Sequence, residues 1–162
     1  MQKIVLVIVA MVGLAAGRNI NWNGLNLIKG FEGYRANYYL DQIGQKTIGY
    51  GHCCVYHPCD QLRPPLSEAQ ATQLLQADLG EFQNCVENSF PGKLSDNQFA
   101  AATSFAFNMG CGAWTGSHIL SNLRANNWAA AANAFNEYTW MGGHQIAGLV
   151  VRRQKEAQLF RS

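Results

Sequence analysis

The sequence predicts an α+β fold that is mostly helical, and two kinds of pattern support this. Two capping boxes, Ser67 with Gln70 and Ser95 with Gln98, each open a long segment whose apolar residues recur at helical spacing. Residues 46–50 alternate instead in the manner of a β-strand. We therefore expect a small sheet in the N-terminal third of the chain and helices in the remainder.

The first residues have the order of a secretory signal peptide. Lys3 precedes an uncharged apolar run from Ile4 to about Ala16, and this run is shorter than the about 20 residues that span a bilayer. A buried N-terminal strand is the alternative. We expect residues 1–17 to be a signal peptide and residues 18–162 to form one domain, because that length suits a single core.

The composition excludes some classes of protein. The 162 residues carry a formal net charge of +2, and charged residues make up 14% of the chain. A nucleic-acid-binding domain has a strong basic excess, so we expect no nucleic-acid partner. Five cysteines in an oxidising compartment indicate disulfides with one thiol left over. Their spacing lacks the paired CxxC pattern of zinc sites, and we expect no metal.

The first helix and the sheet are expected before residue 51. Three apolar residues lie on one stripe of a short helix: Leu25, Ile28 and Phe31. This helix would end near Glu32, with Gly33 as the residue after its end. Residues 38–40 favour a strand, residues 42–45 a turn, and residues 46–50 the second strand of a hairpin.

Helices are expected after a loop at residues 52–65. The first capping box opens a helix to about residue 88, before the break at Pro91-Gly92. The second opens a helix to about residue 109 that is apolar nearly all round, as in a buried central helix. Three further helical stretches are expected: residues 117–125, 128–138 and 149–160.

Two acids in the N-terminal third suit the cleavage of a glycosidic bond. This reaction needs a proton donor and a carboxylate that activates water or attacks carbon. Glu32 lies at a helix end beside apolar Phe31 and Tyr34, surroundings that favour a protonated carboxyl. Asp41, beside a turn, would stay ionised, and the Thr47 hydroxyl could hold a water. From spacing alone, a turn-forming role for Asp41 and a strand role for Thr47 are equally open.

Three motifs in order give the chain a closer resemblance. The residues "FEG", "YLD" and "TIGYGH" resemble the N-terminal signature of the phage-type lysozymes, glycoside hydrolase family 24. "SFAFNMGCGAW" and "GLVVRRQKEAQLF" resemble the central helix and the C-terminal segment of that family. The resemblance covers residues 21–160. It implies a lysozyme-like fold in which a cleft separates a small sheet-bearing lobe from a helical lobe.

The resemblance also implies an activity and a set of site residues. The activity is that of an endo-acting muramidase, which cuts between N-acetylmuramic acid and N-acetylglucosamine in bacterial peptidoglycan without a cofactor. Glu32 would be the acid, while Asp41 and Thr47 would activate water, with inversion at the sugar carbon. The resemblance implies four further substrate contacts: Phe107, Ser117, Asn133 and Cys53. For Phe107, packing in the hydrophobic core is an equally good explanation.

Residues near these motifs have structural explanations. We expect His52 to hold the corner between strand and loop, paired with Asp60 or Asp78. Three residues of the C-terminal segment are expected to form a surface ion pair on a helix: Arg152, Arg153 and Glu156.

The cysteine set resembles that of the secreted eukaryotic branch of the family, notably fungal lysozymes. That pattern implies the bridges Cys54–Cys59 and Cys85–Cys111 and leaves Cys53 free. A Cys53–His52 nucleophile is an alternative, but the motif holds no third residue to orient the histidine. We expect a secreted monomer that has no stable association with membranes after signal cleavage.

Three rival functions differ in the residues they need. A chitinase or a lytic transglycosylase on a related fold is the first, and a transglycosylase needs no water-positioning Asp41 or Thr47. A non-catalytic peptidoglycan-binding module is the second, and it would have lost Glu32. A phage enzyme that uses residues 1–17 as a releasable membrane anchor is the third, and the cysteine pattern speaks against it.

Overall fold

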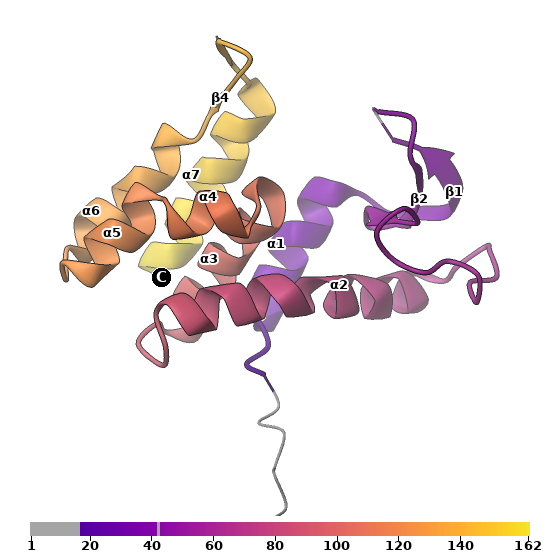
Figure 1. Ribbon diagram of the computed structural model, residues 1–162, viewed down its shortest axis with the longest axis horizontal. Helices are drawn as coiled ribbons and strands as arrows, with labels where there is room; N and C mark the ends of the chain where they lie inside the picture. The colour runs from indigo at the N-terminus through magenta and orange to yellow at the C-terminus, as the bar shows by residue number, and fades with distance from the viewer. Residues whose placement is uncertain (1–16, 42) are drawn as a thin grey trace, which may run out of the picture.

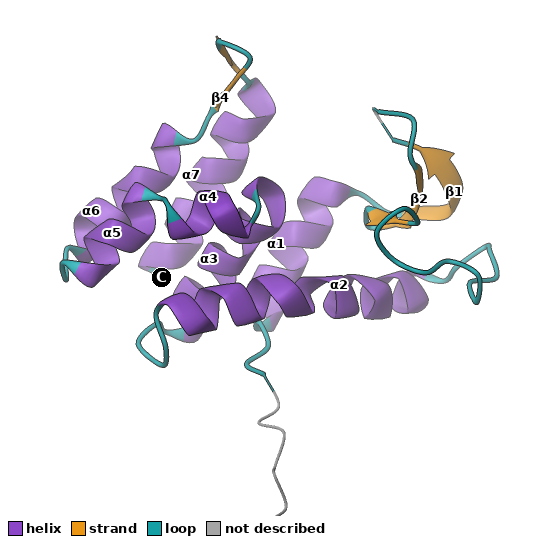
Figure 2. Ribbon diagram, in the orientation of Figure 1, coloured by secondary structure: helices purple, strands orange, loops and turns teal. Residues whose placement is uncertain are grey.

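The computed structural model describes residues 17–41 and 43–162. The predicted signal peptide therefore lies almost wholly outside the described residues, as does Gln42 of the predicted turn. In the described part, no helix has the length and apolar character needed to cross a membrane. The mostly helical α+β fold is confirmed, and Figure 2 shows the larger sheet set apart from the helices.

The elements follow the order expected from the sequence, with a few additions. In chain order they are α1 (Trp22–Glu32), β1 (Arg35–Leu40), β2 (Lys46–Gly49), β3 (His52–Cys53), α2 (Glu68–Ser89), α3 (Asp96–Met109), α4 (Cys111–Thr115), α5 (His118–Arg124), α6 (Trp128–Ala134), the 3₁₀ helix η1 (Phe135–Glu137), β4 (Trp140–Met141), β5 (His144–Gln145) and α7 (Ala147–Arg161). Strands β1, β2 and β3 form one antiparallel sheet, and β4 pairs with β5.

Helix α1 ends where the sequence predicts, and its start is capped. The Asn21 side chain accepts a hydrogen bond from the Gly24 amide at 3.0 Å and caps its N-terminus. Gly33 has a φ of 72°, which glycine adopts without strain, and it turns the chain out of the helix toward β1. Leu25 and Ile28 of the predicted stripe are buried. The end of α1 is therefore fixed at Glu32.

The sheet is slightly larger than predicted. Residues 52–53, which we placed in a loop, form β3, with Ile48 opposite His52 and Thr47 opposite Cys53. A strand of two residues is too short to show an alternating pattern, which explains the error. Strand β2 is buried on both faces, because α2 packs against it.

Two hydrophobic cores correspond to the two predicted lobes. The larger surrounds α3, whose residues 99–106 are all buried, and it contains Trp114 and Phe135. The smaller joins α1, the turn after β2 and α2 through residues such as Ile28, Tyr50 and Leu75. Helix α2 runs along the bottom of the view from the helical lobe toward the sheet (Figure 1). Both capping boxes are present at the starts of α2 and α3.

The short helix α4 and the β4–β5 hairpin were also not predicted, and one predicted helix is divided. Helix α4 has five residues and the strands of the β4–β5 hairpin have two each, so neither shows a period in the sequence. The hairpin turns at Gly142 and Gly143, whose φ values of 57° and 81° favour glycine. The segment predicted at residues 128–138 forms α6 followed by η1.

The disulfides join the pairs that the resemblance implies. Cys54 is bonded to Cys59 within the loop after β3, and Cys85 on α2 is bonded to Cys111 at the start of α4. Cys53 carries a free thiol and is half-buried.

Helix α1 packs tightly against α3 at Gly24. A Cβ at Gly24 would overlap the methyl group of Ala100, whereas a Cβ at Gly30 on the same helix would meet no atom within 4 Å. We expect Gly24→Ala to lower the free energy of unfolding by about 1–3 kcal/mol through overpacking. Gly30→Ala is the control and should raise it by up to about 1 kcal/mol. Urea unfolding of both variants measures this, and equal effects would contradict the packing.

Candidate functional site

A pocket of about 620 Å³ opens between the end of α1 and the β1–β2 hairpin. The three residues predicted to carry the chemistry all line it, together with residues that the sequence did not single out. The lining consists of Glu32, Arg35, Tyr39, Leu40, Asp41, Ile43, Thr47 and Gly51. The fold therefore brings the predicted acid, the second carboxylate and the hydroxyl to one cavity.

One oxygen of the Glu32 carboxylate is hydrogen-bonded to an arginine, and the other is not. Its Oε1 accepts a hydrogen bond from Arg152 Nη1 at 2.7 Å, and its side chain keeps 24% of its exposure. Its Oε2 faces Gly51, where an added Cβ would lie 3.7 Å away. One carboxylate oxygen is thus fixed by an arginine while the other faces the pocket at a position without a side chain.

Asp41 has both a turn-forming role and a place in the pocket. Its Oδ1 accepts hydrogen bonds from the backbone amides of Ile43 and Gln45, at 3.0 and 2.8 Å. This is the way in which aspartate stabilises a turn. The turn fixes the direction of the carboxylate, so the structural explanation and the functional one are compatible.

Thr47 lies on β2 and is 2% exposed, and the hydrogen of its hydroxyl is already used in a hydrogen bond. Oγ1 donates to the backbone carbonyl of Gln45 at 3.1 Å. A hydroxyl has one hydrogen and two acceptor lone pairs, so what Thr47 still offers is acceptance. Tyr39 lies opposite Thr47 in the sheet register. Burial raises the pKa of the Tyr39 phenol, with Glu32 adding to the effect, so this phenol stays protonated and able to donate.

The expected surface position of Arg152 and Arg153 is wrong. They are 5% and 0% exposed, because the face of α7 that carries them packs against α3. The ion pair with Glu156 is present: Arg152 Nε lies 3.2 Å from Oε1 and Arg153 Nε lies 2.8 Å from Oε2. Ser104 donates to Glu156 at 2.7 Å, and Arg153 Nη2 donates to Asn108 at 2.8 Å. We call Ser104, Arg152, Arg153 and Glu156, which are all buried, the buried ion cluster.

Burial shifts the pKa of an acid and of an arginine in the buried ion cluster. It raises the pKa of the Glu156 carboxyl, against the opposing effect of the two guanidinium groups. It lowers the pKa of the Arg153 guanidinium, which the Glu156 charge partly restores. Each buried charge of the cluster has a counter-charge within 3.2 Å, which offsets part of the free-energy cost of burying it.

His52 ties the sheet to α2. It is buried, and its Nδ1 lies 2.9 Å from Asp78 Oδ2, so Asp78 is the partner rather than Asp60. The His57 ring stacks on the His52 ring with centroids 5.2 Å apart. His52 therefore connects β3 with α2, which agrees with the structural role expected for it.

None of the four predicted substrate contacts is among the residues that line this pocket. Phe107 packs edge-on against Phe82, with ring centroids 5.3 Å apart, which agrees with the alternative of core packing. Ser117 is buried, and its hydroxyl accepts from the Leu120 amide and caps α5. The substrate roles of both residues stay predictions.

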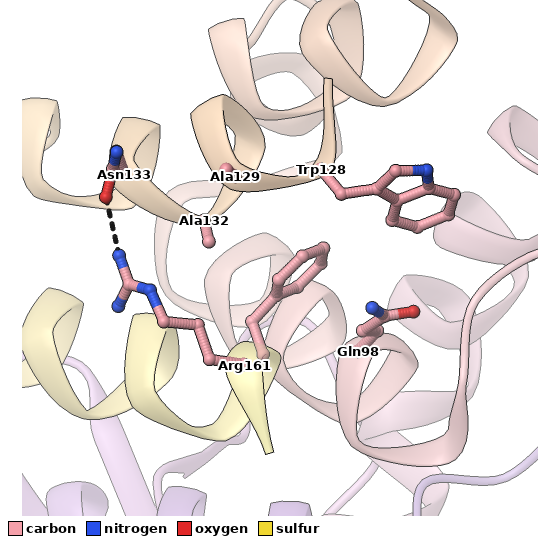
Figure 3. Close-up of a pocket in the computed structure, with 7 residues that line it drawn as sticks. Gln98, Trp128, Ala129, Ala132, Asn133 and Arg161 are labelled. Carbon is pink, nitrogen blue, oxygen red and sulfur yellow. Dashed lines mark hydrogen bonds between the residues drawn. The ribbon is translucent and has the colours of Figure 1, made fainter. Parts of the chain in front are cut away.

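Asn133 lines a different pocket, of about 310 Å³, between α6 and the end of α7. Figure 3 shows it facing Arg161, whose Nη2 donates to its Oδ1 at 2.7 Å. Trp128 and Gln98 lie at the other side of this pocket (Figure 3). The fourth contact, Cys53, is opposite Thr47 in the register, and its thiol donates to Gln45 Oε1 at 3.1 Å.

Sequence reasoning missed Arg35, Tyr39 and Gly51 in the pocket, and Arg152 behind Glu32. Tyr39 and Gly51 fall inside the quoted motifs, so their positions beside the acids were a usable signal. Arg152 lies 120 positions from Glu32, and no local pattern links the two.

Comparisons with known proteins agree with this arrangement. The family model described as phage lysozyme matches residues 29–156. The endolysin of Bacillus phage B103 is 41% identical over 145 residues, which are 88% of this chain and 54% of that protein. The chain thus spans about half the length of the first curated relatives it matches.

Solved structures are similar over nearly the whole described chain. A crystal structure of a P22 lysozyme variant matches with a TM-score of 0.80 at 31% identity, covering 90% of this chain and 99% of that one. The muramidase domain of SpmX from Asticaccaulis excentricus matches with a TM-score of 0.78 at 32% identity, covering 90% and 99%. The link of the cysteine set with a secreted eukaryotic branch stays a prediction.

The buried ion cluster makes a prediction about stability. Glu156→Ala removes the carboxylate shared by Arg152 and Arg153, and it leaves the buried Arg153 charge without its counter-charge. We expect the free energy of unfolding to fall by about 3–5 kcal/mol. The control Glu81→Ala removes an exposed acid of α2 and should change it by less than about 0.5 kcal/mol. Chemical unfolding monitored by circular dichroism distinguishes the two, and a small loss for Glu156→Ala would contradict the cluster's role.

Proposed function

Because the chain belongs to the phage lysozyme family, we propose that it is a glycoside hydrolase that cuts the bond between N-acetylmuramic acid and N-acetylglucosamine in bacterial peptidoglycan. The observation that carries the proposal is the shared pocket, in which Glu32, Asp41 and Thr47 meet. The similarity to a muramidase domain and to lysozyme structures supports the same reaction class.

Glu32 is the proposed general acid. The leaving sugar oxygen needs a proton as the glycosidic bond breaks. Oε2 is the oxygen that meets this requirement, since it faces the open pocket beside Gly51 while Oε1 is held by Arg152. A fixed Oε1 leaves the carboxyl with one orientation, so the acid is positioned before the substrate arrives.

Asp41 and Thr47 are proposed to hold the attacking water. A water that attacks carbon has two hydrogens to place, and two acceptors on the pocket wall suit it. Thr47 Oγ1 has its own hydrogen committed to Gln45, so it accepts from the water. Asp41 accepts the other hydrogen and takes the proton as the new bond forms. Attack from the face opposite the leaving group inverts the sugar carbon.

We further propose that residues 18–162 form the catalytic domain and that the enzyme acts outside the cytoplasm. The two disulfides support an oxidising compartment. The reaction as drawn uses side chains alone, without a cofactor. The chain acts as a monomer in this proposal, since each proposed catalytic group comes from the same chain.

The rival functions are less well supported by the site. A lytic transglycosylase closes the sugar on itself and needs no held water, whereas Asp41 and Thr47 are both in the pocket. A non-catalytic binding module has no use for an acid that is oriented by an arginine at one oxygen and faces the pocket with the other. A chitinase shares the acid requirement and is separated from a muramidase by its substrate.

The first prediction from this proposal concerns the acid. Glu32→Gln keeps the shape of the side chain and its hydrogen bond from Arg152 but has no proton to give. We expect the rate of peptidoglycan clearing to fall at least about 100-fold, because general acid catalysis contributes about 10²–10⁴-fold. Glu81→Gln is the matched control on an exposed helix face and should clear at the rate of the unmodified protein. Clearing by Glu32→Gln at that same rate would show that the acid is wrongly assigned.

The second prediction concerns the water. Thr47→Val removes the acceptor and keeps the branched shape, while Thr47→Ser keeps the hydroxyl. We expect kcat to fall about tenfold or more for Thr47→Val and by much less for Thr47→Ser. Products analysed by mass spectrometry should carry the mass of one added water at each new reducing end. Anhydro-sugar ends would identify a transglycosylase and overturn hydrolysis.

A further inference from the structure

The β4–β5 hairpin exposes large apolar side chains to water. Trp140 and Met141 are 62% and 64% exposed, and Ile146, which follows β5, is 38% exposed. The two strands pair directly and turn at Gly142 and Gly143. Exposed aromatic and aliphatic groups gathered on one projection are typical of a binding surface.

The base of this hairpin is anchored. Thr139 is buried, its carbonyl accepts from the Ile146 amide at 2.8 Å, and its hydroxyl accepts from Gln145 Nε2 at 3.3 Å. The exposed residues therefore stand on a defined support, which is the property that a recognition element needs.

The hairpin leads into the helix that holds the acid. Its second strand runs directly into α7, and Arg152, which binds Glu32, is five positions after the start of that helix. Five positions correspond to about 8 Å along a helix axis. Figure 1 shows the hairpin at the top of α7, rising on the same side of the molecule as the β1–β2 hairpin that lines the pocket. The hairpin and the arginine that orients Glu32 therefore belong to one continuous segment of the chain.

The side chains on one face of the hairpin suit a sugar. Trp140 lies opposite Gln145 in the register, so their side chains share a face, and Met141 shares the other face with His144. An indole presents a flat apolar surface to the C–H face of a sugar ring. The Gln145 amide nitrogen is used by Thr139, which leaves its oxygen to accept from a sugar hydroxyl or acetamido N–H.

We propose that the Trp140 and Gln145 face of the hairpin is a glycan-binding subsite, which holds a sugar of the peptidoglycan strand beyond the bond that is cut. The proposal rests on the proposed function, because it takes the strand in the Glu32 pocket as the ligand. A lipid surface is the weaker occupant, since residues 138–151 contain no lysine or arginine to meet anionic headgroups.

The test compares three variants of the full chain. Trp140→Ala removes the platform, Trp140→Phe keeps an aromatic ring, and Trp22→Ala removes a tryptophan that is 67% exposed at the opposite end of α1 from Glu32. We expect Trp140→Ala to raise KM for polymeric peptidoglycan about tenfold while kcat changes less than twofold. Trp140→Phe should recover most of the loss. Trp22→Ala should have the KM of the unmodified protein.

A binding assay separates this proposal from the proposed function. Each tryptophan variant is combined with Glu32→Gln, and its Kd for insoluble peptidoglycan is measured by co-sedimentation, which needs no turnover. A Kd raised about tenfold by Trp140→Ala and unchanged by Trp22→Ala supports the subsite, even if the protein with Glu32 intact fails to hydrolyse the polymer. Such a failure would count against the hydrolase alone.

Two results would overturn the subsite. The first is an equal Kd for the Trp140→Ala and Trp22→Ala proteins. The second is co-sedimentation with vesicles of phosphatidylglycerol and phosphatidylcholine that Trp140→Ala abolishes while its Kd for peptidoglycan stays unchanged. That result would assign the hairpin to a membrane surface.

Discussion

Arg152 reaches Glu32 from a helix that begins more than a hundred residues later in the chain, and it does so while sharing Glu156 with Arg153. A buried guanidinium needs counter-charges, and Arg152 has one on each side: Glu156 in the core and Glu32 at the pocket. The position of the proposed acid is thus coupled to the packing of α7 against α3. Disturbing the core would move the acid as well as lower the stability.

The orientation of Asp41 depends on local hydrogen bonds rather than on distant parts of the chain. Asp41 is oriented by amides of its own turn, and Thr47 by a carbonyl two residues before it. This part of the site belongs to the sheet lobe, which α2 and the His52–Asp78 contact join to the rest of the molecule. The pocket therefore combines a proposed acid held by tertiary charge pairing with two proposed water-binding groups held by turn geometry. Two carboxylates in such different surroundings can take different roles in one reaction.

Helix α1 connects these two parts. Gly24 gives it close contact with α3, and Gly33 ends it so that Glu32 is its last residue. The β4–β5 hairpin, which leads into the helix that carries Arg152, presents exposed aromatic and amide groups to water. A polymeric substrate needs contacts along its length as well as at the bond that is cut, and binding energy from distant sugars helps to place that bond.

Local patterns in the sequence determined the helix starts at Ser67 and Ser95, the end of α1 at Gly33 and the turn after Asp41, because these depend on backbone groups a few residues apart. The resemblance of the motifs around Glu32, Asp41 and Thr47 to the phage-type lysozymes, rather than their spacing alone, indicated the residues that share the pocket. The tertiary structure decided which polar side chains are buried and what they contact: Arg152 and Arg153 inside the core, Ser117 in a cap, Asn133 at another pocket. Helical periodicity places a residue on a face, but the burial of that face depends on segments far away in the chain, and no local spacing records them.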